Sequence, residues 1–211
     1  MKYLVGTGGW GYFPNPNQPS LKLYSQIYNF VEVNQTFYEF PDTKTVQRWH
    51  KIAPKNFTFA VRCHQILTHK LALDPVDEAY YILGQMVAYC AILHTPYLVL
   101  ETPHSFSITK EVANKAKDLF SSWDLKNIQL IWEIRAPITH AALDLMQDLK
   151  IIQCTDLSKQ KPSFNLDVTY SRLFGKGKHN IYQFTNDELQ EIKHNAEETN
   201  SKTVILAYHG A

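Results

Sequence analysis

The stretch IQLIWEIR, residues 128–135, decides the fold class because it alternates between two kinds of side chain. One set is wholly apolar and consists of Ile128, Leu130, Trp132 and Ile134. The other set ends in two charged residues, Glu133 and Arg135. Successive side chains of a strand point to opposite faces of a sheet. The pattern therefore predicts a strand with one apolar face and charges at the carboxyl end of the other.

Seven further stretches have strand character, and helix-like segments separate them. The predicted strands are residues 3–6, 30–34, 57–62, 97–101, 128–135, 151–156, 168–174 and 203–209. Helices are expected from about residue 20, after Asp42, over 74–94, 109–121 and 139–149, and from Thr185 to about 199. Asp74-Pro75 is read as a cap followed by a first-turn proline, and Thr185 with Glu188 as a capping box. Alternation of strand and helix indicates a parallel sheet, and eight strands indicate an α/β fold of the TIM-like (β/α)8 barrel type. The alternative is an open, doubly wound sheet.

The predicted barrel is compact, a single domain over residues 1–211, and it has two irregularities. Residues 157–166 contain Pro162 and little periodicity, so helix six is expected to be short or absent. Helix eight is missing, because the sequence ends just after the last strand. The outward apolar side chains of strands one and eight, such as Val204 and Leu206, then need another cover. We expect a second subunit of a homo-oligomer, a rearranged N-terminal segment or the helix from Thr185 to supply it.

Composition limits the classes of partner and compartment. The chain has 211 residues, 45% of them hydrophobic, and a net charge of +1, so it can form a core and carries no overall field toward nucleic acid or membranes. Its three cysteines, at 63, 90 and 154, form no CxxC pair, which favours a reducing, cytoplasmic location. No apolar stretch is long enough to span a bilayer, so no membrane association is expected.

Polar side chains collect at the predicted carboxyl ends of the strands. They are Glu32, Asn34, Arg62, Glu101, Glu133, Arg135, Asp156, Arg172 and His209. Active sites of TIM barrels lie at this end, so these residues are predicted to converge on one mouth. The carboxylates are expected to pair there with guanidinium groups and to have lowered pKa values. The alternative is a ring of salt bridges that only closes the barrel.

The residue types suggest a ligand. Guanidinium groups bind phosphate or carboxylate bidentately, so Arg62, Arg135 and Arg172 are candidate anion ligands. The candidate catalytic residues are Glu133, as general acid or base, with Asp156 and Glu32. Asn34, Glu101 and His209 are further candidates for ligand contact, and Glu32, Asn34 and Asp156 for holding hydroxyl groups.

These assignments predict an enzyme acting on a small, anionic, hydroxylated ligand such as a sugar phosphate or a nucleotide fragment, without a cofactor. One alternative is a phosphodiesterase that depends on a divalent metal bound by the carboxylates and histidines. Another is a module without catalytic activity that binds nucleic acid or a protein.

Residues 6–11, GTGGWG, match the G-x-G-x-x-G fingerprint of dinucleotide sites. That fingerprint requires a helix to open at the glycines, and Pro14, Pro16 and Pro19 exclude one here. A loop over the barrel mouth is the better interpretation. In it, Trp10 either stacks on a ligand or anchors its own loop. Trp49, inside a helical pattern, is predicted to be core.

Several of these segments also carry a family resemblance. They include GTGGW at 6–10, VEVNQTFY at 31–38, WEIR at 132–135 and YSRL at 170–173. In this order and spacing they resemble the domain-of-unknown-function family 72 (DUF72, YecE-like). The resemblance implies a TIM-barrel-like fold and no settled biochemical function. The chain departs from the family pattern with Arg62 in place of lysine, Glu101 in place of glutamine and Phe174 in place of histidine. It also has Tyr208-His209-Gly210 where an asparagine-rich end is usual.

Overall fold

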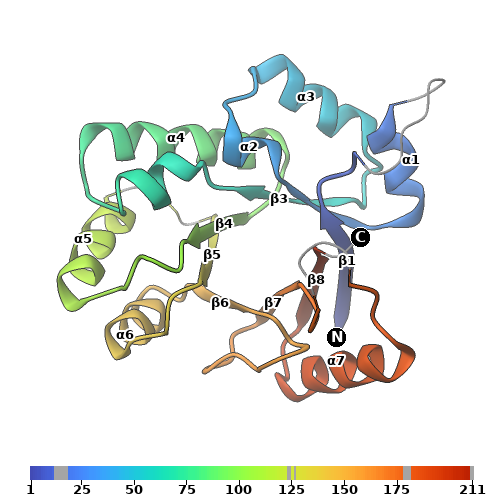
Figure 1. Cartoon of the computed structure of the whole chain (residues 1–211). Helices are drawn as coiled ribbons and strands as arrows, with labels where there is room; N and C mark the ends of the chain where they lie inside the picture. The colour runs from blue at the N-terminus through green and yellow to red at the C-terminus, as the bar shows by residue number, and fades with distance from the viewer. Residues whose placement is uncertain (12–18, 123–124, 126, 178–181, 210–211) are drawn as a thin grey trace.

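A computed structural model describes residues 1–11, 19–122, 125, 127–177 and 182–209. Eight parallel strands form a closed barrel in chain order, with helices around the outside (Figure 1). They are β1 (Lys2–Gly8), β2 (Phe30–Val33), β3 (Thr58–Arg62), β4 (Tyr97–Thr102), β5 (Gln129–Ile134), β6 (Ile152–Thr155), β7 (Val168–Leu173) and β8 (Thr203–Tyr208). Pairing of β1 with β8 closes the barrel, from Lys2 opposite Thr203 to Thr7 opposite Tyr208. The barrel prediction is confirmed, and the open sheet is excluded.

The structure describes eight helices, of which six were predicted from their start signals and one of those six begins later than predicted. They are α1 (Ser20–Ile27), α2 (Gln35–Tyr38), α3 (Thr43–Ile52), the π-helix η1 (Ile66–Lys70), α4 (Asp77–Ile92), α5 (Lys110–Ser121), α6 (His140–Asp148) and α7 (Asn186–Glu198). Asp42 caps α3, and Thr185 with Glu188 forms the predicted capping box of α7. The predicted cap at Asp74-Pro75 is wrong, since α4 begins at Asp77 after Val76. Asp74 lies in a preceding turn, where its backbone N–H donates to Leu71 and its carboxylate pairs with Lys115.

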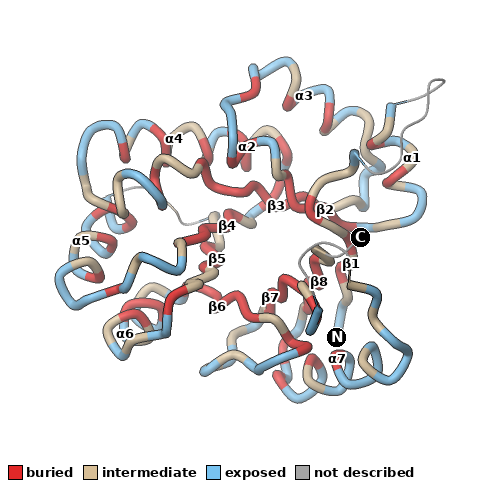
Figure 2. The backbone as a smooth tube through the Cα atoms, in the orientation of Figure 1, coloured by how far each residue is buried: buried red, intermediate tan, exposed pale blue. Residues whose placement is uncertain are grey.

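Alternation along the strands divides the apolar residues between two cores. Ile131 of β5 faces the barrel interior with Leu4, Phe30, Val99, Tyr170 and Ile205. Leu130 and Trp132 face the helices, in the larger core that also holds Trp49. Buried residues run along most of the barrel wall (Figure 2). Glu133 has the same parity as Ile131, so the alternation directs it into the barrel at the carboxyl end.

No helix lies between β6 and β7, where residues 156–167 are all described. The helix-facing residues of β6 are Gln153 and Thr155, which are polar and buried. The Gln153 Oε1 accepts a hydrogen bond of 2.6 Å from the backbone N–H of Ser163. A loop that hydrogen-bonds to Gln153 therefore covers this strand in place of an apolar helix. Helix six is absent here, as the sequence predicted.

Helix α7 covers the outer face of β8. Ile192 and Ala196 of α7 pack with Val204 and Leu206, and all four residues are buried. Of the three covers expected for this face, the helix from Thr185 is the one observed. The β8 face is therefore covered from within the chain, while the homo-oligomer stays a prediction.

None of the helices in the described ranges is long and apolar enough to cross a membrane. Cys63, Cys90 and Cys154 are buried and free, and burial raises the pKa of the Cys63 thiol to about 12. The cysteines therefore serve as small core residues in this fold.

Candidate functional site at the barrel mouth

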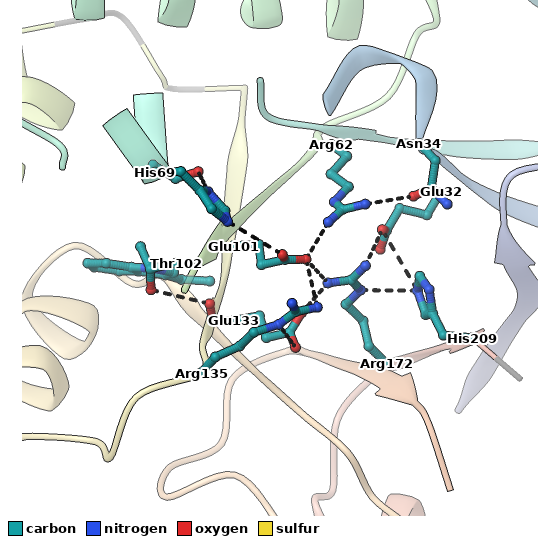
Figure 3. Close-up of polar contacts among 12 residues, drawn as sticks. Glu32, Asn34, Arg62, His69, Glu101, Thr102, Glu133, Arg135, Arg172 and His209 are labelled. Atoms are coloured by element: carbon teal, nitrogen blue, oxygen red, sulfur yellow. Dashed lines mark hydrogen bonds and ion pairs between the residues drawn. The ribbon is translucent and has the colours of Figure 1, made fainter. Parts of the chain in front are cut away.

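Six charged side chains from five strands meet at the carboxyl end of the barrel (Figure 3). They are Glu32, Arg62, Glu101, Glu133, Arg135 and Arg172, and ion pairs or hydrogen bonds join them into one network. They converge because each follows the inward-facing residues of its strand. The predicted convergence is observed for these six residues, and the three glutamates balance the three arginines in charge.

Arg172 is the centre of the network. Its Nη2 lies 3.1 Å from Oε1 of Glu32, and its Nη1 lies 2.5 Å from Oε2 of Glu101 and also contacts Oε2 of Glu133. Burial alone would lower the pKa of this guanidinium, but the three carboxylates outweigh it and raise the pKa well above its usual range. Arg172 therefore stays charged and holds the three glutamates together.

Glu101 receives charge from all three arginines. Its Oε2 contacts Arg62 and Arg172 and lies 3.1 Å from Nη2 of Arg135. Burial would raise the pKa of this carboxyl, yet the arginine charges and the hydrogen bond from Arg172 lower it to about 2. For Glu101, the expected pairing with guanidinium groups and the lowered pKa are confirmed.

Glu32 forms the floor of the network. It is fully buried, and its Oε2 accepts a hydrogen bond of 2.7 Å from the Tyr170 hydroxyl. The Oε1 faces Arg172, with Nε2 of His209 at 3.8 Å. In this arrangement Glu32 has no surface with which to hold a ligand hydroxyl, because Tyr170, Arg172 and His209 surround its carboxylate.

Asp156 does not pair with a guanidinium group, and that expectation is wrong for it. Its carboxylate accepts hydrogen bonds from the Ser158 backbone (3.0 Å) and hydroxyl (2.6 Å) and from the Phe174 backbone (3.1 Å). Its charge partner is the Lys159 Nζ at 3.2 Å. The carboxylate is used locally because the loop after β6 returns polar groups to it. Asp156 therefore ties the β6 loop to the end of β7.

The three mouth arginines differ in access to solvent. Arg62 lies with its guanidinium carbon 3.7 Å from the Phe37 ring centre and donates to Oδ1 of Asn34 at 3.3 Å. The side chains of Arg62 and Arg172 are 7% and 2% exposed, whereas that of Arg135 is 29% exposed. Arg135 is therefore the arginine of the network that a ligand reaches without rearrangement.

A cavity of about 270 Å³ opens beside Arg135. Its charged lining consists of Glu133, Arg135, Asp156, Lys159 and Arg172. A larger cavity, about 400 Å³, lies at the opposite end of the barrel around Asn29 and Phe57, but no charged side chain lines it. The cavity at the mouth is therefore the candidate site.

Three further residues line this cavity that were not predicted as site residues: Lys159, Gln160 and Phe174. The predicted absence of helix six was the signal in the sequence that could have indicated Lys159 and Gln160. Without that helix, the segment after β6 can lie at the mouth.

Trp10 packs against the helix layer. Its ring meets that of Trp49 edge-to-face at 5.2 Å, and it is partly buried against the outer core. This arrangement matches the anchoring interpretation of Trp10. The rest of the predicted loop, residues 12–18, lies outside the described residues.

The donor groups at the mouth do not fit a divalent metal. In the described part of the chain, no group of three or more His, Cys, Asp or Glu side chains is placed to hold an ion. Glu32, Glu101 and Glu133 each contact a guanidinium group, which competes with a cation for the same oxygens. The glutamates that the metal-dependent phosphodiesterase alternative needs as metal ligands are therefore paired with arginines instead.

Comparison with known proteins gives matches over parts or all of the chain. The chain is 30% identical to the UPF0759 protein YunF of Bacillus subtilis (strain 168) over an alignment of 101 residues, and this alignment covers 44% of this chain and 34% of YunF. The match thus spans about a third of that relative. A DUF72 family protein of Thermotoga maritima MSB8 has a similar structure, with a TM-score of 0.76 and 18% identity over 99% of this chain and 92% of that one. A DUF72 family protein of Enterococcus faecalis V583 is also similar, with a TM-score of 0.74 and 16% identity over 99% of this chain and 90% of that one.

The sequence profile of the family described as "Protein of unknown function DUF72" matches residues 4–210, nearly the whole chain. The expected family resemblance is thereby confirmed, and with it the barrel seen in the related structures. The chain belongs to the DUF72 family.

Proposed function

We propose that the barrel mouth is an active site for a small, anionic, hydroxylated ligand such as a sugar phosphate or nucleotide fragment. The observation that carries the proposal is the charge of the cavity lining. Three cations, Arg135, Lys159 and Arg172, face two carboxylates, Glu133 and Asp156. The lining thus has a net positive charge, and two of its cations have access to solvent. Because Glu101 behind the cavity compensates Arg135 and Arg172, it is the access of Arg135 and Lys159 to solvent that leaves them open to a bound anion.

Arg135 is the first candidate for anion contact. Its Nε lies 3.3 Å from Oε1 of Glu133 and its Nη2 lies 3.1 Å from Oε2 of Glu101. These contacts fix the plane of the guanidinium and leave Nη1 without a bond to any described residue. A group held in this way loses little conformational freedom when it binds phosphate. Lys159 supplies a second charge on the same cavity.

Glu133 is the candidate acid or base. The Glu133 side chain is 13% exposed, while Glu32 and Glu101 are essentially buried. Among the three glutamates of the network, Glu133 is the one that lines the cavity. It is therefore placed to exchange a proton with a hydroxyl of a ligand whose anionic group contacts Arg135.

Calorimetric titration with inorganic phosphate and with D-ribose 5-phosphate tests the proposal. Arg135→Ala is expected to weaken both ligands by about tenfold or more. The matched control is Arg48→Ala, because Arg48 is the fourth arginine of the chain and is exposed on α3, outside the mouth. Absence of binding to wild type, or equal binding by both variants, would contradict the proposal. Binding of a single-stranded oligonucleotide without binding of either small ligand would support the nucleic-acid module instead.

The proposal includes a cytoplasmic location. Three buried thiols that form no disulfide suit a reducing compartment.

A further inference from the structure

We propose that Asn34 and His209 form a pair of uncharged hydrogen-bond donors above Gly8, and that this pair binds an uncharged oxygen of the ligand. The inference rests on the proposed function and specifies it further. It assigns the hydroxyl or carbonyl end of a sugar phosphate to the side of the mouth formed by β8, β1 and β2.

The network fixes which nitrogen of His209 carries a proton. Nε of Arg172 donates to Nε2 of His209 at 3.0 Å, and a guanidinium group can only donate. Nε2 is therefore the acceptor, so the proton of the neutral ring is on Nδ1. Burial, followed by the charges of Arg172 and Arg62, holds the pKa of His209 well below its usual range. Phe174 stacks on the ring at 5.0 Å and restrains its plane.

The orientation of the Asn34 amide is fixed in the same way. Nη1 of Arg62 donates to Oδ1 of Asn34 at 3.3 Å, which identifies that atom as the oxygen. The amide nitrogen Nδ2 is therefore on the other side, with its two N–H groups. Within the described part of the chain, the side-chain hydrogen bonds of the two residues are those that Oδ1 of Asn34 accepts from Arg62 and Nε2 of His209 accepts from Arg172, so Nδ2 and Nδ1 donate to no described acceptor.

Gly8 brings the two donors together. A Cβ atom on Gly8 would lie 2.8 Å from Nδ2 of Asn34 and 2.8 Å from Nδ1 of His209. The two nitrogens are therefore no more than twice that distance apart. An oxygen forms N–H···O bonds of about 2.9 Å, so a single oxygen on the side away from Gly8 can accept from both. A Cβ on residue 8 would also lie 2.5 Å from Cε1 of His209, so any larger residue there would push the two side chains out of place.

Arg172 and Arg62 beside the pair are each paired with a carboxylate, Glu32 and Glu101, so no unpaired cation among the described residues is left there to attract an anionic oxygen. Glu32 lies directly behind the pair, with its Oε1 at 3.8 Å from Nε2 of His209. The cavity with the exposed cations is on the other side of Arg172, whose Nε contacts His209 and whose Nη1 contacts Glu133. One guanidinium group thus separates the two sides (Figure 3). A pentose phosphate can place its phosphate at Arg135 and a sugar oxygen at the donor pair.

Comparison of two probes separates this inference from the proposed function. Inorganic phosphate reports on the anion site alone, and D-ribose 5-phosphate reports on both sites. The variants are Asn34→Leu, which removes one donor, and Gly8→Ala, which keeps both donor groups but whose Cβ pushes them out of position. Asn114→Leu, on the exposed face of α5, is the control.

Wild type is expected to bind ribose 5-phosphate more tightly than phosphate. Asn34→Leu and Gly8→Ala should each reduce this preference about tenfold and change phosphate affinity less than twofold. Melting temperatures identify a variant that fails to fold, and the other variant then decides. The inference is overturned if wild type shows no preference, or if the preference survives in the folded variants. If wild type binds neither probe, the proposed function fails as well.

Discussion

Replacement of Glu101 by glutamine should destabilise the protein in a pH-dependent manner. The folded protein lowers the pKa of Glu101 from 4.5 to about 2, through three guanidinium groups that overcome burial. At about 1.4 kcal/mol per pKa unit, the ionised carboxylate contributes about 3 kcal/mol to the free energy of unfolding. Because the folded pKa is the lower one, this contribution is complete above about pH 5 and is lost as the pH falls toward 2. At pH 3 roughly half of it should remain.

Urea unfolding of wild type and Glu101→Gln at pH 7, 4 and 3 measures this contribution. The difference between the two proteins should be about 3 kcal/mol at pH 7 and about half of that at pH 3. The control is Glu111→Gln, since Glu111 is exposed on α5 and contacts Lys115 alone among described side chains. It should change stability by less than about 0.5 kcal/mol. An equal difference at pH 7 and pH 3 would refute the electrostatic account of the network.

Three further substitutions test other parts of the structure. Arg172→Met should lower the free energy of unfolding by about 3 kcal/mol or more, since Glu32, Glu101 and Glu133 lose their shared partner; urea unfolding showing no more loss than Arg48→Met would contradict this. Ile192→Ala should cost about 2–4 kcal/mol if α7 covers β8, and a loss below 1 kcal/mol would show that it does not. Trp10→Ala should lower the melting temperature and leave phosphate affinity unchanged, whereas a selective loss of affinity would indicate a stacking role.

The barrel was predictable because its two cores impose different patterns on the strands. In β5, Leu130 and Trp132 must face the helices while Ile131 faces the interior, and that alternation is visible in the sequence. The start of α4 was not predictable from its capping signals. Asp74 is of a residue type that often caps helices, but its carboxylate pairs with Lys115 of α5, which is distant in sequence.

The site was predictable to the extent that strand parity determines it. Parity places Glu133 and Arg172 in the same mouth, and they are in contact there. It does not determine how deeply each side chain is buried, so Glu32 was expected to be accessible and is not. Strand parity does not determine the conformation of the loops either. Asp156 turns to Ser158 and Lys159 because the loop after β6 returns to the strand end, which no periodicity encodes.

A crystal structure determined with D-ribose 5-phosphate tests the central claim most directly, because it locates the ligand without assuming a reaction. We expect the phosphate in the cavity of about 270 Å³, with oxygens within hydrogen-bonding distance of Arg135 and Lys159. A sugar oxygen should lie between Nδ2 of Asn34 and Nδ1 of His209. Full occupancy of the ligand at another surface, with the mouth network unchanged and its cavity holding only water, would contradict the claim. The salt bridges would then serve only to close the barrel.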